Sequence, residues 1–81
     1  MTGPAALVFY TREGCHLCER FLLEFSLDFP AAADELTVRD VDTVPAWAVD
    51  YGLRVPVLVT DGDVVCEGRY DRARVGAVLG L

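Results

Sequence analysis

The stretch AALVFYTREGCHLCERFLLEF, residues 5–25, decides the fold of this chain. Residues 5–10 form a continuous apolar run of strand length, which is typical of a strand buried on both faces in the middle of a sheet. From Cys15 onward, apolar residues instead recur at helical spacing, at positions 18, 21, 22, 25 and 29. Pro30 ends this helix, because the residue before a proline is pushed out of the helical region. The stretch therefore predicts a buried strand that runs directly into an amphipathic helix.

The rest of the chain continues the alternation of strands and helices. Further strands are expected over residues 36–41, 55–60 and 63–67, and further helices between residues 43 and 52 and between residues 71 and 80. Asp61-Gly62 between two β-branched runs is a strong hairpin signal. Asp42 or Thr43 can cap the middle helix, and Asp71 can cap the last one.

These elements follow the order β-α-β-α-β-β-α. A strand–helix–strand start implies a right-handed crossover and a parallel strand pair, whereas the hairpin adds antiparallel strands. The sequence thus predicts a single α/β domain over residues 1–81, built as a four-stranded mixed sheet that is covered by helices on both faces.

Composition excludes several classes of protein. The 81 residues carry a formal charge of −6, and a nucleic-acid binder needs a basic face. No apolar run approaches the roughly 20 residues that a membrane span requires. Residues 1–10 place no basic residue before their short apolar stretch, so we expect no signal peptide. We therefore expect a monomer in the reducing cytoplasm, without nucleic-acid or membrane partners.

The three cysteines divide into a pair and a single residue. Cys15 and Cys18 form a C-x-x-C motif at a helix start, where free amide hydrogens and the helix dipole favour a thiolate, the nucleophile of disulfide exchange. Cys18 lies one turn into the helix and is placed to resolve a mixed disulfide on Cys15. Cys66 stands among apolar residues and is expected in the core. The motif therefore predicts redox chemistry.

Other candidate residues allow more than one interpretation. His16, when protonated, favours the Cys15 thiolate; alternatively, it is an exposed loop residue without a role. Zinc prefers four ligands, and the only thiols and imidazole available are those of Cys15, Cys18, Cys66 and His16, so we expect no metal site. Trp47 and Tyr51 lie one turn apart and are expected to pack against the sheet.

The chain resembles glutaredoxins, and in particular short single-domain glutaredoxin-like proteins. The resemblance rests on the strand over residues 7–10, the loop over residues 11–18, Val55-Pro56-Val57 and the Asp61-Gly62 hairpin, and it covers nearly the whole chain. It implies a thioredoxin fold with a reactive Cys15 and a resolving Cys18. It also implies that Pro56 is a cis-proline beside them and that Val55 offers backbone groups to a bound peptide or to glutathione.

The same resemblance implies glutathione-binding residues. Arg12 matches the basic residue near the first cysteine, and Tyr70 falls near the glutathione groove. Gly68 and Asp71 match the turn before the last helix, where Asp71 would meet the glutathione amine. The chain departs from the family pattern in two places: that turn has one glycine instead of two, and Cys-His-Leu-Cys replaces Cys-Pro-Tyr-Cys.

The leading hypothesis is a thiol–disulfide oxidoreductase that uses the Cys15–Cys18 dithiol. It would have no tightly bound cofactor, would take glutathione as a co-substrate, and would act on a disulfide-containing protein or a glutathione mixed disulfide. Two alternatives remain open: a thioredoxin-fold binding module whose catalysis has lapsed, and a binder of a glutathione-ligated iron–sulfur cluster.

Overall fold

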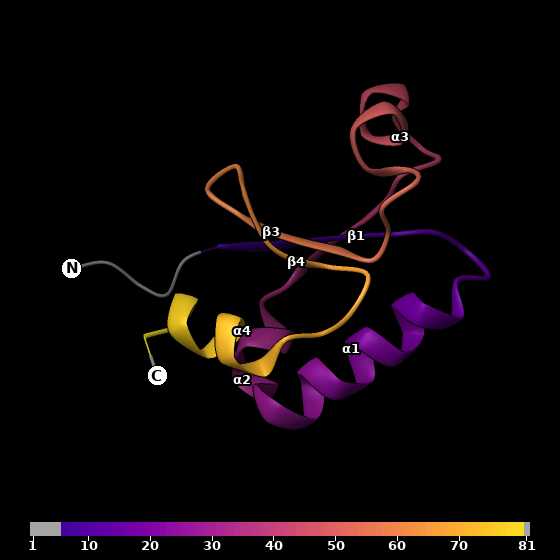
Figure 1. Cartoon of the computed structure of the whole chain (residues 1–81). Coiled ribbons are helices and arrows are strands. Elements are labelled where there is room, and N and C mark those ends of the chain that lie inside the picture. The colour runs from indigo at the N-terminus through magenta and orange to yellow at the C-terminus, as the bar shows by residue number, and fades with distance from the viewer. Residues whose placement is uncertain (1–5, 81) are drawn as a thin grey trace.

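A four-stranded mixed sheet forms the middle layer of the structure, a computed structural model that describes residues 6–80. The strands are β1 (Leu7–Thr11), β2 (Thr37–Asp40), β3 (Val57–Thr60) and β4 (Asp63–Glu67), and the helices are α1 (His16–Asp28), α2 (Pro30–Asp34), α3 (Pro45–Tyr51) and α4 (Arg72–Val78). The strand order is β2-β1-β3-β4, with β1 parallel to β2 and the other neighbours antiparallel. Helix α3 covers one face, and α1, α2 and α4 cover the other (Figure 1). The predicted fold class is confirmed.

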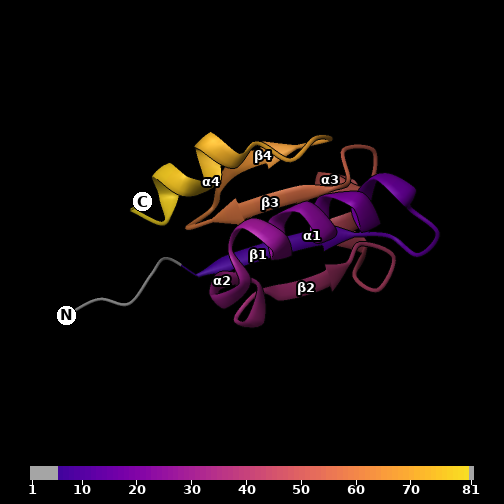
Figure 2. The same ribbon diagram turned by 90° about the horizontal axis from the view of Figure 1, so that it is seen from below.

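Strand β1 lies between β2 and β3, as its unbroken apolar sequence predicts (Figure 2). Phe9 is fully buried and packs among the side chains on the α1 face, whereas its neighbour Tyr10 packs in the cluster on the α3 face. Successive side chains of a strand point to opposite faces, so one strand serves both cores. The predicted strand starts at Ala5, which lies outside the described residues.

The larger core lies between the sheet and α1 and α4. Its buried members come from three strands and two helices and comprise Leu7, Phe9, Cys18, Phe21, Phe25, Leu58, Val65, Cys66 and Val75. The buried residues of α1 recur at helical spacing and form the face predicted from the sequence. This packing fixes α1, and with it the C-x-x-C motif, against the sheet.

The smaller core lies under α3. Tyr10 stacks on Tyr51 with ring centroids 4.1 Å apart and meets the edge of Trp47 at 5.9 Å. The Arg39 guanidinium lies 4.9 Å from the Trp47 ring and donates a 2.9 Å hydrogen bond to the Tyr10 hydroxyl. The expected packing of Trp47 and Tyr51 against the sheet is confirmed.

Of two expectations about helix ends, one is confirmed but incomplete and the other is wrong. Helix α1 ends at Asp28 with Phe29 as its C-cap, directly before Pro30 as predicted. Pro30 does not only end a helix: it occupies the first turn of α2, where its missing N–H has no helical partner to lose. The middle helix is capped by neither Asp42 nor Thr43, because its N-cap residue is Val44 and no side chain caps it. The Asp42 carboxylate binds elsewhere, as described below.

Other local signals are confirmed. Asp61 and Gly62 both have positive φ angles, 51° and 82°, which a tight hairpin turn requires. Asp71 is the N-cap residue of α4, and its carboxylate accepts a 3.1 Å hydrogen bond from the N–H of Arg74. Across residues 6–80, no helix has the length and apolar character needed to traverse a bilayer. The expectation about a signal peptide falls partly on residues 1–5, outside the described part of the chain.

Candidate functional site

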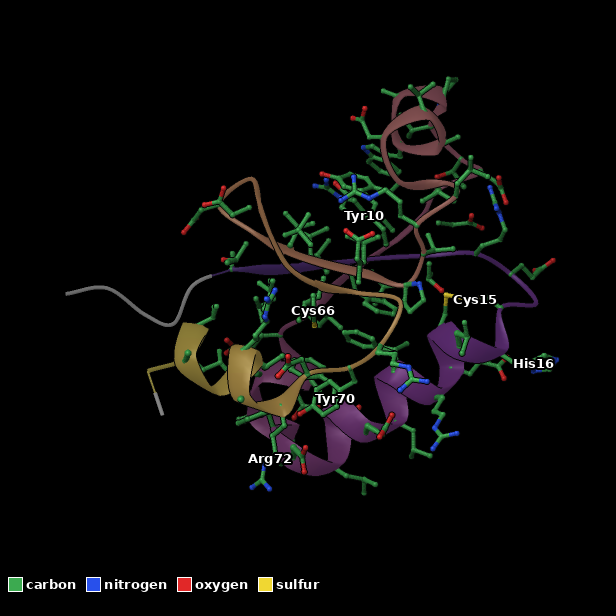
Figure 3. All side chains as sticks on the ribbon, viewed as in Figure 1. Tyr10, Cys15, His16, Cys66, Tyr70 and Arg72 are labelled. Carbon is green, nitrogen blue, oxygen red and sulfur yellow. A yellow bond between two sulfur atoms is a disulfide. The ribbon has the colours of Figure 1, made fainter. Side chains whose placement is uncertain are left out.

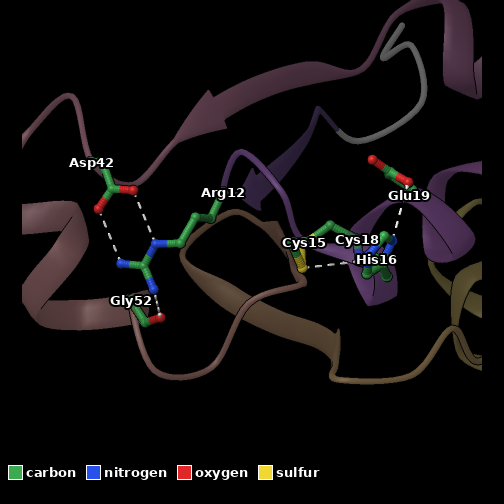
Figure 4. Close-up of a disulfide and its surroundings, with 7 residues drawn as sticks. All are labelled: Arg12, Cys15, His16, Cys18, Glu19, Asp42 and Gly52. Carbon is green, nitrogen blue, oxygen red and sulfur yellow. Dashed lines mark hydrogen bonds and ion pairs between the residues drawn. A yellow bond between two sulfur atoms is a disulfide. The ribbon is translucent and has the colours of Figure 1, made fainter.

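The two cysteines of the C-x-x-C motif are joined by a disulfide bond at the start of α1 (Figure 4). Their Cα atoms are 5.2 Å apart, within the range that disulfides span. After β1, a turn through Gly14 leads to Cys15, which is the N-cap residue of α1. The cysteine pair expected at this strand-to-helix junction is therefore present in its oxidised form.

The sulfur of Cys15 lies where a helix favours negative charge. It accepts a hydrogen bond from the backbone N–H of Cys18 at 3.1 Å, as an N-cap side chain does. The first amides of a helix have no helical partner, and the helix dipole adds positive potential there. Once the disulfide is opened, this position stabilises a Cys15 thiolate.

The two sulfur-bearing residues differ in their access to solvent. Cys18 is 1% exposed and belongs to the larger core, whereas Cys15 is half-buried at its edge. A disulfide or thiol from solution can therefore reach the sulfur of Cys15, whereas the sulfur of Cys18 is shielded from solvent and contacts the sulfur of Cys15. This asymmetry fits a site in which the first cysteine attacks and the second resolves, as expected from the sequence.

His16 lies beside the disulfide in sequence but points away from it. Its side chain is 95% exposed and extends from the N-terminal end of α1 into solvent (Figure 3). Its Nδ1 atom lies 3.8 Å from a carboxylate oxygen of Glu19, one turn along the helix. Of the two interpretations of His16, the exposed position agrees better with a residue outside the reacting centre.

Arg12 makes contacts that the sequence did not indicate. Its Nε and Nη2 atoms donate to the two carboxylate oxygens of Asp42 at 2.9 and 3.0 Å, and its Nη1 atom donates to the carbonyl of Gly52 at 3.0 Å. The hydrogen bond to Arg12 lowers the pKa of the Asp42 carboxyl. The guanidinium is directed away from the disulfide (Figure 4). All three of its nitrogens therefore already donate within the protein, and its expected role toward glutathione remains a prediction.

The segment before β3 contains the second part of the expected site. The peptide bond between Val55 and Pro56 is cis. The Val55 N–H donates to the carbonyl of Tyr51 at 3.1 Å, so this backbone group already has a partner within the protein. The Pro56 carbonyl accepts from the N–H of Gly68 at 2.8 Å. This bond attaches the turn after β4 to the Val55–Pro56 segment.

A groove of about 270 Å³ runs between α1 and the turn that leads into α4. It is lined by Leu17, Arg20, Phe21, Glu24, Gly68, Arg69 and Tyr70. The structure thus brings two of the residues expected to bind glutathione, Gly68 and Tyr70, against the first turns of the helix that carries the dithiol. Leu17, which lies between the two cysteines in sequence, is 59% exposed at this groove.

Tyr70 and Asp71 both have structural partners at this turn. The Tyr70 ring packs edge-on against Phe21 at 5.5 Å, and its hydroxyl donates a 2.8 Å hydrogen bond to Asp28 near the end of α1. Burial, followed by this hydrogen bond, raises the pKa of the Tyr70 phenol, so it stays protonated at neutral pH. The Asp71 carboxylate caps α4. It does not line the 270 Å³ groove.

Cys66 is separate from the dithiol. It is 6% exposed in the larger core, and burial raises the pKa of its thiol (Figure 3). The expectation that it is a core residue is confirmed. Within residues 6–80, no group of three or more His, Cys, Asp or Glu side chains is arranged to hold a metal ion.

Two residues that shape the site, Asp42 and Gly52, were not identified as such from the sequence. They lie 30 and 40 positions from Arg12, and no local pattern links them to it. Gly52 is buried, and a Cβ atom there would lie 3.3 Å from Arg12 Nη2 and would collide with the carbonyl of Ala48. Gly52, the C-cap residue of α3, therefore also leaves room for the guanidinium.

Comparison with known proteins gives a matching family model and several similar solved structures. Residues 6–80 match the family model described as "Glutaredoxin-like domain (DUF836)". The solution NMR structure of protein Ne2328 from Nitrosomonas europaea is similar at 33% identity and a TM-score of 0.81, over 98% of this chain and 95% of that one. The X-ray structure of XcR50 from X. campestris is similar at 34% identity and a TM-score of 0.71, over 93% and 96%. No curated protein matches the chain.

Proposed function

This chain belongs to the glutaredoxin-like (DUF836) family, and from that premise we propose that it is a thiol–disulfide oxidoreductase acting through Cys15 and Cys18. One observation carries the proposal: the two cysteines are bonded to each other at the N-terminus of α1, with Cys15 accessible and Cys18 buried. A disulfide between positions three apart closes too short a loop to stabilise the fold greatly, so a chemical role explains the pair better than a structural one.

The reaction proceeds from the reduced dithiol. The Cys15 thiolate attacks one sulfur of the substrate disulfide, and the other substrate sulfur leaves as a thiolate that takes a proton from solvent. Cys18 then loses its proton and attacks the Cys15 sulfur, which releases the second substrate thiol and forms the Cys15–Cys18 disulfide. Two electrons thereby pass to the substrate. Two molecules of an external thiol return the protein to the dithiol form and become a disulfide themselves.

Glutathione is the external thiol that we propose. The groove beside α1 supports this choice, since Gly68 and Tyr70 line it next to the dithiol helix. Protein disulfides and glutathione mixed disulfides are the proposed substrates, and we place the reaction in the reducing cytoplasm, carried out by a monomer. Arg12 and Asp71 have internal partners, so their direct contact with glutathione would require those bonds to exchange.

The proposal is tested by measuring the rates at which the protein reduces hydroxyethyl disulfide and insulin with glutathione as the external thiol. We expect the wild type to be active, Cys15→Ser to lose activity, and Cys18→Ser to accumulate a mixed disulfide on Cys15 that is visible by mass spectrometry. Cys66→Ala is the matched control, because Cys66 is a buried free cysteine that takes no part in the disulfide, and it should retain activity. Equal activity of the wild type and Cys15→Ser would refute the proposal, and inactivity of both would favour a binding module.

A further inference from the structure

Three segments of the chain meet at the Arg12 side chain. We call Arg12, Asp42 and Gly52 the Arg12 clasp. Arg12 belongs to the loop between β1 and α1, Asp42 to the loop between β2 and α3, and Gly52 to the C-terminal end of α3. Three hydrogen bonds of 2.9 to 3.0 Å join them, two of them in the paired geometry in which a guanidinium binds a carboxylate most strongly.

The clasp is connected to both halves of the redox site. On one side, the backbone carbonyl of Arg12 accepts a hydrogen bond from the N–H of Cys15 at 3.2 Å, so the residue that holds the clasp also holds the attacking cysteine. On the other side, Gly52 is followed after two residues by Val55 and Pro56, and the Val55 N–H is itself bonded to Tyr51 at the end of α3. The clasp therefore joins the loop that carries Cys15 to the segment that carries the cis-proline.

The backbone turn that carries Asp42 is held by hydrogen bonds of its own. Its own N–H donates to a carboxylate oxygen of Asp40 at 2.9 Å, and the next backbone link in this loop runs from the Thr43 N–H to the Asp40 carbonyl at 3.1 Å. The carboxylate that receives Arg12 thus stands on a hydrogen-bonded turn directly after β2. A carboxylate whose backbone is held in this way is suited to position the guanidinium.

We propose that Arg12 is a positioning residue for the disulfide exchange, holding Cys15 in its N-cap geometry through Asp42 and Gly52, instead of binding the substrate through its charge. This inference rests on the proposed function. Loss of the clasp loosens the loop before α1, and the Cys15 sulfur then spends less time at the amide hydrogens that stabilise its thiolate.

The direction in which each substitution changes the Cys15 thiolate fraction distinguishes a positioning role of Arg12 from a role of its charge. If Arg12 acted only through its charge, Arg12→Gln would disfavour the Cys15 thiolate, whereas Asp42→Asn would favour it by leaving an unpaired guanidinium nearby. If Arg12 positions Cys15, both substitutions break the same contact and both disfavour the thiolate. The double variant should then be no worse than the more affected single variant.

Alkylation of reduced protein by the neutral reagent iodoacetamide, measured against pH and located on Cys15 by mass spectrometry, gives the thiolate fraction. We expect Arg12→Gln, Asp42→Asn and the double variant each to lower that fraction at pH 7 by about three- to fivefold, the effect of weakening one N-cap interaction. Arg12→Lys keeps the charge but not the paired geometry, and it should behave like Arg12→Gln.

Two control variants make the same charge changes elsewhere. Arg72→Gln removes an exposed arginine whose closest carboxylate is 3.8 Å away on Asp28, and Asp34→Asn removes an exposed carboxylate in α2. Both should alkylate like the wild type. A second probe, anionic iodoacetate, should slow in the clasp variants by the same factor as iodoacetamide.

Opposite effects of Arg12→Gln and Asp42→Asn, or a loss restricted to iodoacetate, would overturn the inference in favour of a charge role. Unchanged alkylation in all clasp variants would also overturn it. If circular dichroism shows that Arg12→Gln does not fold, Arg12→Lys and Asp42→Asn allow the same comparison. A wild type that cannot reduce any disulfide would instead refute the proposed function, while the alkylation comparison would still stand or fall by itself.

Discussion

Replacement of Phe25 by alanine tests whether the helix that carries the dithiol is held by the larger core. Phe25 is 0% exposed, and its ring centroid lies 6.2 Å from that of Phe29 and 6.3 Å from that of Tyr70. Truncation of a fully buried phenylalanine costs about 3–5 kcal/mol of unfolding free energy, because transfer energy is lost and a cavity remains. An 81-residue domain has about 4–12 kcal/mol in total. We therefore expect Phe25→Ala to lose about half of its stability.

Urea denaturation measures this loss. Trp47 is the single tryptophan and belongs to α3, on the opposite face of the sheet from Phe25, so its fluorescence reports global unfolding. Far-ultraviolet circular dichroism reports the helices in the same titration, and coincident transitions would establish two-state behaviour. The matched control is Leu23→Ala in the same helix: Leu23 is 60% exposed, and its loss should change the unfolding free energy by less than about 0.5 kcal/mol.

The comparison has a clear refuting result. A loss below about 1 kcal/mol for Phe25→Ala, or an equal loss for both variants, would mean that α1 does not pack through the face described above. A transition midpoint that falls without a change in the denaturant dependence would locate the effect in the folded core. Because α1 begins at the cysteine pair, a small or equal loss would also remove the structural basis for the buried Cys18.

Two further predictions concern the turn before α4. Asp71→Ala removes the N-cap hydrogen bond to the Arg74 N–H and should lower the unfolding free energy by about 1 kcal/mol, whereas Asp71→Asn should lower it much less. Thermal unfolding of both variants measures the two losses. Equal losses would mean that the charge of Asp71 matters more than its capping hydrogen bond. Folding raises the pKa of the Tyr70 phenol, so the stability contributed by its neutral form is complete below about pH 10 and is lost as the pH rises toward the folded-state value. The chain has no lysine to add its own titration in this range. Tyr70→Phe should therefore show a smaller loss of stability than the wild type as the pH rises above about 10, and identical pH profiles would contradict the assignment.

Much of the fold was predictable because its signals are local. The apolar run of β1, the helical spacing of Phe21 and Phe25 and the hairpin at Asp61 each depend on residues that are close in sequence. The position of the C-x-x-C motif at a strand-to-helix junction is local as well. Short α2 was missed because a proline is compatible both with the end of one helix and with the first turn of the next.

The amino-acid sequence by itself determined the order of the strands and of every helix except α2, the two-sided burial of β1 and the candidate dithiol, since backbone preference and apolar spacing act over a few residues. The tertiary structure alone decided which charged and polar side chains meet. Arg12 reaches Asp42 across 30 positions, and Tyr70 reaches Asp28 across 42. Such contacts depend on where the sheet brings distant loops together, and several acidic residues could have served equally well as partners. The sequence thus showed where the redox chemistry lies, and the fold showed what holds it in place.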